Sequence, residues 1–230
     1  MPDLSPTSPI VALRGVGPSR SRALAAAGFV TIRDLLHLLP ARYEDRRRRC
    51  RVAEIDGPGK YLLVGRLESL KRIRVRRRHL TLVRGLFLDD TDKLPVVWFN
   101  RPYLPTQIDE EREYSLYGEA RERATGFELV NPSVEPVDPG NPPRIVPVYP
   151  AVPGVGGSLL RSLIQQALDR CDLEGFRDPL PEDLLRRHGL PELSEAVRQL
   201  HAPKESADLD ELNERRSAAH SRLSYGEFLE

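Results

Sequence analysis

The sequence predicts an α+β protein in which a small five-stranded β-barrel lies between an N-terminal and a C-terminal helical segment. Runs of β-favouring residues separated by turns fill residues 60–131, and helical patterns flank them on both sides. Residues 131–157 are rich in proline and glycine, which is typical of a linker. We therefore expect four stretches: a helical segment over residues 1–50, the barrel over 51–131, the linker over 132–157 and a second helical segment over 158–230.

The N-terminal segment is predicted to be helical from about residue 10 to residue 45. Gly28 is expected to end a first short helix at Leu24–Ala26, because glycine tolerates the left-handed conformation that closes a helix. Thr31 is expected to cap a second helix, with Asp34 as the acidic partner of a capping box. A leucine-rich stretch follows, and Pro40 is expected to stop this helix.

Five strand-like runs make up the predicted barrel. They carry the β-branched and aromatic residues typical of strands, and polar turns such as Asp89–Asp92 separate them. A short element over Arg101–Ile108 falls between the third and fourth runs. Five strands within about 70 residues are typical of an OB-fold barrel. The runs are Tyr61–Leu67, His79–Leu88, Leu94–Phe99, Arg112–Gly118 and Thr125–Val130.

The C-terminal segment shows the apolar spacing of helices. Ser158 is expected to cap a helix whose apolar positions begin at Leu160 and continue to Leu168. Three further helices are predicted over Pro181–His188, Glu192–Leu200 and Asp208–Phe228.

Catalytic and cofactor motifs are missing from the sequence. Gly59-Lys60 is followed by Tyr61 rather than by Ser or Thr, so this pair does not belong to a phosphate-binding P-loop. The five histidines and the two cysteines, Cys50 and Cys171, have neither metal-ligand nor disulfide spacing. We therefore expect no cofactor, no metal and no catalytic residue in this chain. An apolar run of about 18 residues and a signal peptide are also missing, which predicts a cytoplasmic protein without membrane contact.

The net charge of +1 hides an uneven distribution along the chain. Residues 41–84 hold 15 Lys and Arg against five Asp and Glu, a local charge of +10, whereas residues 85–230 carry −11. A basic block of this density indicates a polyanionic partner. A solvated charged surface is the alternative.

Two arginine clusters make up the basic block. The first is Arg46-Arg47-Arg48-Arg49 with Arg51, and the second is Lys71–Arg78, which would lie in the loop between the first two strands. This loop is a usual nucleic-acid contact of OB-folds, and arginines there would bind phosphates without reading base sequence. A solvated surface is the alternative for both clusters. The expected phosphate contacts are Arg46, Arg47, Arg48, Arg72, Arg74, Arg76, Arg77, Arg78 and Arg101.

Gly15-Val16-Gly17 resembles the hairpin of a helix-hairpin-helix element. Two glycines allow a tight turn, and the amide groups at the start of the next helix suit a phosphate. Arg14, Arg20 and Arg22 would add positive charge nearby. The equal alternative is a helix–helix turn that packs the fold and touches no DNA.

Three aromatic residues lie close together at the end of the third predicted strand. Trp98 and Phe99 are adjacent, so on a strand they point to opposite faces, and Tyr103 follows after Pro102. Exposed aromatics beside a basic groove would stack on unpaired bases, with about 1–3 kcal/mol per base. From the residues alone, three core aromatics are the alternative.

A series of segments, in the same order along nearly the whole chain, resembles the N-terminal part of the RecG family. Members of this family are bacterial ATP-dependent helicases that remodel stalled forks and Holliday junctions. The most specific segments are Asp34–Asp45 and Arg144–Pro150. The others are Leu13–Leu24 with Gly28, Trp98-Phe99-Asn100, Pro102-Tyr103-Leu104, Asn131-Pro132, His201-Ala202-Pro203 and Arg222–Leu229.

The resemblance implies an OB-fold wedge that sits at a DNA branch point and separates the strands. Two aromatics of the family's wedge stack on bases where the strands part, and the matching positions here are Phe99 and Tyr103, while Trp98 would stay in the barrel. The implied partner is branched DNA, namely replication forks and Holliday junctions. We expect a monomer in the bacterial cytoplasm, associated with the nucleoid.

The family's motor, which binds ATP and Mg, would begin after Leu229, so this chain alone is expected to have no ATPase activity. The acidic run Asp109–Glu113 fills a loop in which family members often have glycine, and it would repel phosphate. The alternative function is an OB-fold scaffold that binds protein partners and has little affinity for DNA. The charge of −11 after residue 84 motivates this alternative.

Overall fold

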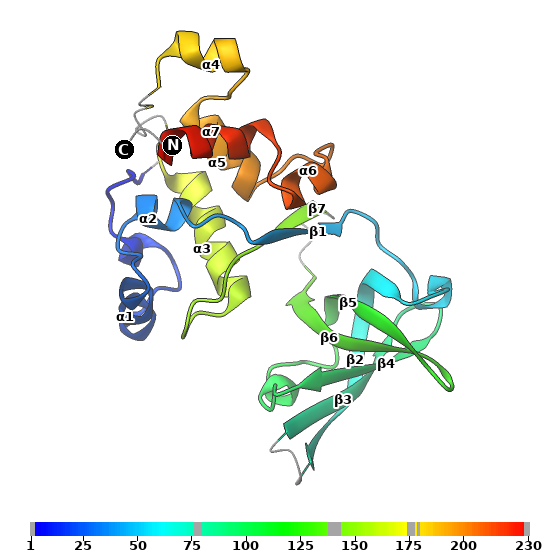
Figure 1. Ribbon diagram of the computed structural model, residues 1–230. Helices are drawn as coiled ribbons and strands as arrows, with labels where there is room; N and C mark the ends of the chain where they lie inside the picture. Colours follow the sequence, from blue (N-terminus) through cyan, green and yellow to red (C-terminus); the bar gives the residue numbers. More distant parts are fainter. Residues whose placement is uncertain (1–2, 76–79, 138–143, 174–177, 179, 228–230) are drawn as a thin grey trace. The chain divides into compact units, whose positions relative to one another are not determined.

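The computed structural model consists of two compact units (Figure 1). The helical unit comprises residues 1–45 and 144–230, and the barrel unit comprises residues 46–143. The structure describes residues 3–75, 80–137, 144–173, 178 and 180–227. The N-terminal and C-terminal helical segments, which are far apart in the sequence, therefore belong to one unit.

The barrel unit contains a closed five-stranded barrel, which confirms the predicted α+β fold with an OB-type barrel. The strand order is β2-β3-β4-β6-β5, and β5 pairs with β2 to close the barrel. Strand β4 pairs with β6 in parallel, and the other neighbouring strands pair antiparallel. The 3₁₀ turn η4 (Leu104–Thr106) lies between β4 and β5, where the sequence predicts a short element, and η2 (Val52–Glu54) precedes β2. The strands are β2 (Gly59–Val75), β3 (Leu80–Leu88), β4 (Lys93–Phe99), β5 (Glu113–Arg123) and β6 (Gly126–Pro136).

Alternation of side chains along the strands fills the barrel. Every second residue of β4 points inward, so Leu94, Val96 and Trp98 are buried. They pack against Leu63 of β2 and Phe87 of β3 in one apolar core. Each such side chain contributes about 1.5–3 kcal/mol by its burial, so this core holds the barrel closed.

Strand β2 is much longer than the predicted run Tyr61–Leu67. It continues to Val75 and pairs with β3 over Lys71–Val75, past a bulge at Ser69, where φ is 56°. The second arginine cluster, predicted as a hairpin loop, therefore begins on a strand, and its part over residues 76–78 lies outside the described residues. The prediction was wrong because pairing with β3 overrides the low strand propensity of consecutive charged residues.

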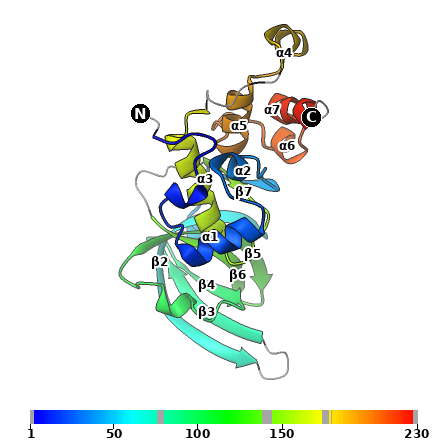
Figure 2. The ribbon, with the colours of Figure 1, turned by 90° about the vertical axis from the view of Figure 1, so that its left-hand side faces the viewer.

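The helical unit packs short helices around a long one, α3 (Gly157–Arg170). In both views α3 lies beside α2, and α5 lies beside α7 (Figures 1 and 2). Leu160 and Ile164 of α3 share a core with Leu24 and Leu35 of the N-terminal segment. The other helices are η1 (Ile10–Ala12), α1 (Pro18–Ala26), α2 (Ile32–Leu36), α4 (Glu182–His188), α5 (Leu193–His201), α6 (Leu209–Asn213) and α7 (Ala218–Glu227).

Two local predictions for the N-terminal segment are confirmed. Gly28 follows the first helix with a φ of 90°, which is the left-handed conformation expected of it. Thr31 caps α2 through its Oγ1, which accepts the N–H of Asp34 at 3.3 Å, and the Asp34 carboxylate accepts the N–H of Thr31 at 2.7 Å. The bond from the Thr31 N–H lowers the pKa of Asp34, because it stabilises the charged carboxylate.

The predicted helix up to residue 45 and the predicted linker both contain a strand instead. Strand β1 (Arg42–Arg46) pairs with β7 (Arg144–Val148) in a two-stranded sheet. Tyr43 and Ile145 of this sheet are buried in a core that also contains Leu200. These contacts join residues more than 100 positions apart, so the local sequence pattern could not indicate them.

The C-terminal helices also differ in detail from the prediction. Ser158 lies inside α3, and Gly156 takes the cap position that Ser158 was expected to fill. The single helix predicted over Asp208–Phe228 is interrupted between α6 and α7, where Arg215 has a φ of 56°. Among the helices of the described residues, none is long and apolar enough to cross a membrane.

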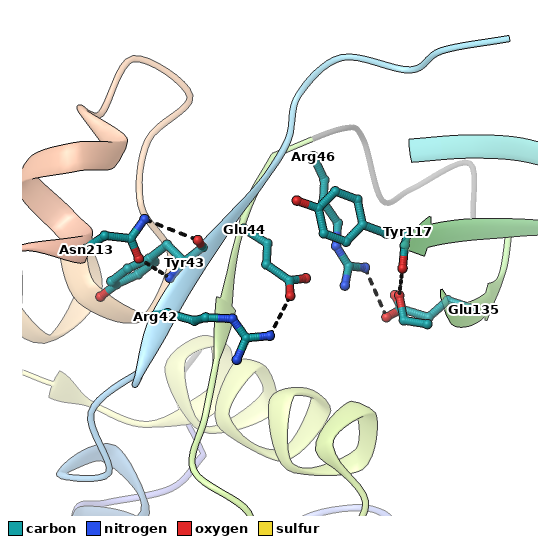
Figure 3. Close-up of polar contacts among 8 residues, drawn as sticks. Arg42, Tyr43, Glu44, Arg46, Tyr117, Glu135 and Asn213 are labelled. Atoms are coloured by element: carbon teal, nitrogen blue, oxygen red, sulfur yellow. Dashed lines mark hydrogen bonds and ion pairs between the residues drawn. The ribbon is translucent and has the colours of Figure 1, made fainter. Parts of the chain in front are cut away.

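Tyr43 anchors β1 within the helical unit (Figure 3). Its backbone N–H donates to Oδ1 of Asn213 at 2.7 Å, and its carbonyl oxygen accepts a bond from Nδ2 of the same residue at 3.3 Å. The hydroxyl of Tyr43 donates to the carbonyl of Leu200 at 2.9 Å. The strand is thereby tied to α6 by its backbone and to α5 by its side chain.

A buried ion pair joins the last helix to the segment between α3 and α4. Arg222 of α7 is 1% exposed, and its guanidinium donates to Asp178. The Asp178 carboxylate also accepts the backbone N–H groups of Leu180 at 2.9 Å and Leu193 at 2.8 Å. Because a buried arginine is costly without a carboxylate partner, this pair fixes where α7 packs.

His201 is a buried neutral histidine in the same unit. Its Nε2 lies 2.8 Å from the carbonyl of Leu36, which can only accept, so Nε2 carries the proton. Nδ1 then accepts the hydroxyl of Tyr149, at 2.9 Å. Burial lowers the pKa of His201 to about 4.

We predict that the helical unit loses stability below pH 6.5 because the unfolded chain binds a proton that His201 does not bind when folded. For a group whose pKa is depressed on folding, the stabilisation is present above the unfolded pKa of about 6.5 and is lost as the pH falls toward the folded value. Urea unfolding followed by far-ultraviolet circular dichroism between pH 7.5 and 5 measures this slope.

His201→Gln should remove most of the slope in that range. His220, whose pKa burial also lowers, leaves a smaller slope of the same sign. His188→Gln is the control, and an unchanged slope in His201→Gln would contradict the prediction.

Candidate nucleic-acid interface

The end of β4 separates the three neighbouring aromatics. Trp98 is fully buried in the barrel core, as predicted, whereas Phe99 is 37% exposed on the opposite face of the strand. Tyr103 is 52% exposed at the start of η4. Phe99 and Tyr103 therefore have the exposure that stacking on a base requires, and Trp98 does not.

A corner of β6 at Asn131-Pro132 holds the end of β4 in place. Oδ1 of Asn131 accepts the backbone N–H of Phe99 at 2.8 Å, and the carbonyl of Pro132 accepts the indole N–H of Trp98 at 2.8 Å. Asn131 has a φ of 47°, a conformation that asparagine tolerates better than most residues. Asn131 is therefore a positioning residue, and its only signal in the sequence is its place in the Asn131-Pro132 pair.

Gly118 of β5 allows this corner to form. A Cβ at Gly118 would lie 2.8 Å from Pro132, which is too close for any other residue. The register between β5 and β6 shifts at the same place, between Tyr117 and Glu119. Close approach at Gly118 thus brings the Pro132 carbonyl to the Trp98 indole.

Tyr103 is held by the short turn that follows β4. Leu104, the next residue, is 5% exposed and packs in the barrel core. The carbonyl of Tyr103 accepts the hydroxyl of Thr106 at 2.7 Å. At the end of β4, Asn100 has a φ of 57°, and its N–H donates to the carbonyl of Thr81 at 2.7 Å. The turn at Asn100 and the buried Leu104 therefore hold Tyr103 at the surface of the barrel, where its ring is exposed.

Arginines of the second cluster follow on the long part of β2. Arg72 and Arg74 are exposed and stand opposite Val83 and Thr81 of β3. Arg76, Arg77 and Arg78 lie outside the described residues. Arg101 is half-buried, and its guanidinium lies 3.5 Å from the Pro132 carbonyl. Arg72 and Arg74 are thus on the same sheet as Phe99, but they point to its opposite face, because Phe99 stands opposite Leu82, which lies between Thr81 and Val83.

Arg46 of the first cluster is buried against Tyr117 and Glu135 of the barrel unit (Figure 3). It is 7% exposed, its guanidinium lies 4.6 Å from the ring centroid of Tyr117, and Nη1 lies 3.3 Å from Oε1 of Glu135. An arginine committed to a carboxylate and an aromatic ring is a poor phosphate contact, so we leave Arg46 out of the interface. Arg48 is exposed and Arg47 is half-buried.

The Gly15–Gly17 hairpin packs against α3 within the helical unit. Gly15 has a φ of 94°, and Arg14 exchanges backbone hydrogen bonds with the side chain of Gln166 at 2.9 and 3.2 Å. The element before the hairpin is the 3₁₀ turn η1 rather than a full helix. These contacts support the packing alternative, and phosphate binding by Gly15, Val16 and Gly17 stays a prediction.

The chain is similar to known proteins over most of its length. A model of the RecG wedge domain matches residues 9–171, which is most of the chain. This chain belongs to the RecG wedge domain family. The expected resemblance is thereby confirmed.

Curated relatives of this RecG wedge chain are ATP-dependent DNA helicases named RecG. The protein from Escherichia coli K12 is 32% identical over 227 residues, covering 96% of this chain and 32% of the relative. The protein from Thermotoga maritima is 28% identical over 208 residues, covering 88% of this chain and 26% of the relative. The chain therefore spans about a third or less of these relatives' length.

A solved structure of RecG bound to a three-way DNA junction has a similar fold. It superimposes with a TM-score of 0.67 at 26% identity, and the match covers 93% of this chain and 29% of that chain.

We predict that the Asn131 side chain stabilises the barrel through the Phe99 N–H. Asn131→Asp keeps an acceptor, Asn131→Gly keeps only the backbone freedom, and Asn131→Ala loses both. Stability should fall in that order, by about 1 kcal/mol for the lost hydrogen bond and about 1–3 kcal/mol for the strained backbone.

Fluorescence of Trp98, the one tryptophan of the chain, measures the unfolding of the barrel in urea. Equal stability of the Gly and Ala variants would contradict the part assigned to the backbone, and a wild-type-like Gly variant would contradict the part assigned to the hydrogen bond.

Proposed function

We propose that this RecG wedge chain binds branched DNA, at replication forks and Holliday junctions, and separates the strands at the branch point. The observation that carries the proposal is the exposure of Phe99 and Tyr103, since large aromatics on a soluble barrel normally lie inside. Both rings would stack on the last base pairs or on unpaired bases where the strands part.

Phosphate contacts would come from the exposed face of the basic block. Arg72 and Arg74 stand on β2 in the same sheet as Phe99 but point to its other face, and they offer charge without base specificity. The remaining members of the proposed contact set are Arg47, Arg48, Arg76, Arg77, Arg78 and Arg101.

The comparisons support branched DNA as the ligand. The family is named after a wedge domain, and a related RecG protein has been solved on a three-way junction. A branch is a favourable place for stacking, because its bases are already partly unpaired and the few kcal/mol needed to unstack a base step within a duplex are not required.

The wedge would act together with a motor that pulls on the duplex. The curated relatives are ATP-dependent helicases about three to four times as long as the matched region. We propose that ATP and Mg belong to motor domains of such a longer protein, and that the wedge contributes strand separation rather than hydrolysis. As a monomeric module it would place one barrel at one branch point.

We predict that Phe99→Ala together with Tyr103→Ala weakens binding to a three-way fork by about thirtyfold or more, since each of the two stacked bases contributes about 1–3 kcal/mol. Fluorescence anisotropy at fixed moderate salt would compare the fork with a linear duplex and a single strand of equal length. Because both rings are exposed, the melting temperature should change little.

Tyr225→Ala is the matched control, because Tyr225 is 39% exposed in the helical unit. Equal wild-type affinity for all three DNAs would contradict the proposed function. No DNA affinity at low salt would favour a scaffold for protein partners instead.

We predict that replacing Arg72, Arg74, Arg76, Arg77 and Arg78 by Gln flattens the salt dependence of DNA binding. Each lost phosphate contact should reduce the slope of log K against log salt by about 0.9 on duplex DNA. Arg121→Gln is the control, because Arg121 is exposed on β5 but already pairs with Glu119 at 3.0 Å. An unchanged slope in the cluster variant would remove this cluster from the interface.

A further inference from the structure

A cavity of about 210 Å³ lies within the helical unit, between β7, α3 and the end of α5. Its lining residues all fall between positions 144 and 203, so the cavity is complete within this unit. Sites for drug-sized ligands measure about 300–1,000 Å³ and one water takes up about 30 Å³ in the liquid, so this cavity suits a single polar group. We refer to it as the arginine pocket, which is lined by Arg144, Ile145, Pro147, Tyr149, Arg161, Ile164, Gln165, His201, Ala202 and Pro203.

Two half-buried arginines reach the arginine pocket from different elements. Arg144 begins β7, and Arg161 lies on α3 on the same helix face as Gln165, one turn away. Burial raises the pKa of Tyr149, and the positive charge of Arg161 acts against this rise, so the guanidinium is near the Tyr149 hydroxyl. Among the described residues that line the pocket, none is an Asp or a Glu. The lining therefore carries two positive charges and no negative one.

A neutral histidine–tyrosine pair forms one wall of the pocket. The rings of Tyr149 and His201 are stacked with their centroids 5.7 Å apart, and the Tyr149 hydroxyl donates to Nδ1 of His201 at 2.9 Å. The other ring nitrogen of His201 donates to the carbonyl of Leu36 at 2.8 Å. Both protons of the pair are thus used within the fold, so an anion in the pocket must bind to the arginines instead.

The two guanidiniums favour a phosphate group over a carboxylate. A phosphate monoester carries a charge of about −1.5 to −2 at pH 7 and three strong acceptor oxygens, whereas a carboxylate has one charge and two oxygens. Guanidinium groups bind phosphate oxygens in a bidentate manner. Each of the two arginines also has an interaction within the chain, and the five N–H donors of a guanidinium can serve a chain partner and a phosphate together.

We propose that the arginine pocket binds a phosphate group that bridges Arg144 of β7 and Arg161 of α3. The DNA backbone and free inorganic phosphate both present this group, and the experiment below separates these two sources. Bound phosphate would tie β7 to α3 and stabilise the helical unit. The inference is independent of the proposed function, because no residue of the barrel unit lines the pocket.

Thermal unfolding of the 230-residue chain tests the site. Circular dichroism at pH 7.5 would follow the melting temperature in rising sodium phosphate, with sodium chloride keeping the ionic strength constant. A ligand that binds only the folded state stabilises it, so the melting temperature should rise by about 3 °C or more at about ten times the dissociation constant. Sodium acetate is the reference for the ligand class, and an equal rise in acetate would contradict a phosphate site.

Arg144→Gln and Arg161→Gln should each remove most of this rise. Arg198→Gln is the matched control, because Arg198 is exposed on α5 and does not line the pocket. Phosphate also stabilises proteins in general by strengthening apolar burial, and that effect is the same in every variant. Equal rises in the wild type and in all three variants would therefore overturn the proposal.

Ala202→Glu keeps the test decisive if an arginine variant does not fold. Ala202 is exposed where it lines the pocket, so the substitution adds a carboxylate there and leaves both arginines in place. The phosphate response should be lost in this variant while its melting temperature without phosphate stays near that of the wild type. A phosphate response that persists in Ala202→Glu would overturn the proposal.

Fluorescence anisotropy with a linear duplex separates the two sources of the phosphate group. If the DNA backbone occupies the pocket, Ala202→Glu should weaken duplex binding about tenfold, and Arg198→Gln, which changes the net charge equally, should not. If free phosphate is the ligand, duplex binding stays equal in both variants while the phosphate response of the wild type remains. Absence of both effects overturns the pocket, whereas a missing preference for forks contradicts only the function proposed for Phe99 and Tyr103.

Discussion

The hydrogen bond from the Trp98 indole to the Pro132 carbonyl fixes the inside and the outside of the barrel at the place where the proposed interface begins. Trp98 is fully buried, and a buried N–H without an acceptor costs about 1–3 kcal/mol, so the carbonyl of Pro132 must reach it. That reach needs the close approach at Gly118 and the left-handed conformation of Asn131. With Trp98 held inside, the next residue of β4 must point outward, and Phe99 is exposed as a consequence.

Arginine has two different tasks in this chain, and burial separates them. Arg46 and Arg222 are buried, and each is bound to a carboxylate, Glu135 and Asp178 respectively. A guanidinium removed from water needs such a partner, so these two residues stabilise the fold. Arg72 and Arg74 are exposed on β2, and their charge remains accessible to a polyanion. A count of basic residues therefore overstates the surface that can bind DNA.

Much of the architecture follows from local chemistry that is legible in the sequence. The Thr31–Asp34 capping box, the left-handed Gly28 and the five strands of the barrel needed only capping, glycine and β-propensity arguments. The strand pair β1 and β7 was not predictable in this way, because Tyr43 and Ile145 are separated in the sequence by residues 46–143, which form a unit of their own. The interruption between α6 and α7 at Arg215 was not predictable either, because no glycine or proline lies there.

The candidate site divides along the same line. By itself the sequence determined which residue types are available: a dense basic block, and adjacent aromatics that must point to opposite faces of a strand. Only the tertiary structure decided that Trp98 is the inward ring, that Arg46 is buried, and that Arg72 points to the face opposite to Phe99. The physical reason is that the local sequence does not determine which face of a strand points into the core. Pairing with strands that are distant in the sequence determines it. One extra residue at Ser69 changes the face of every residue that follows it on β2.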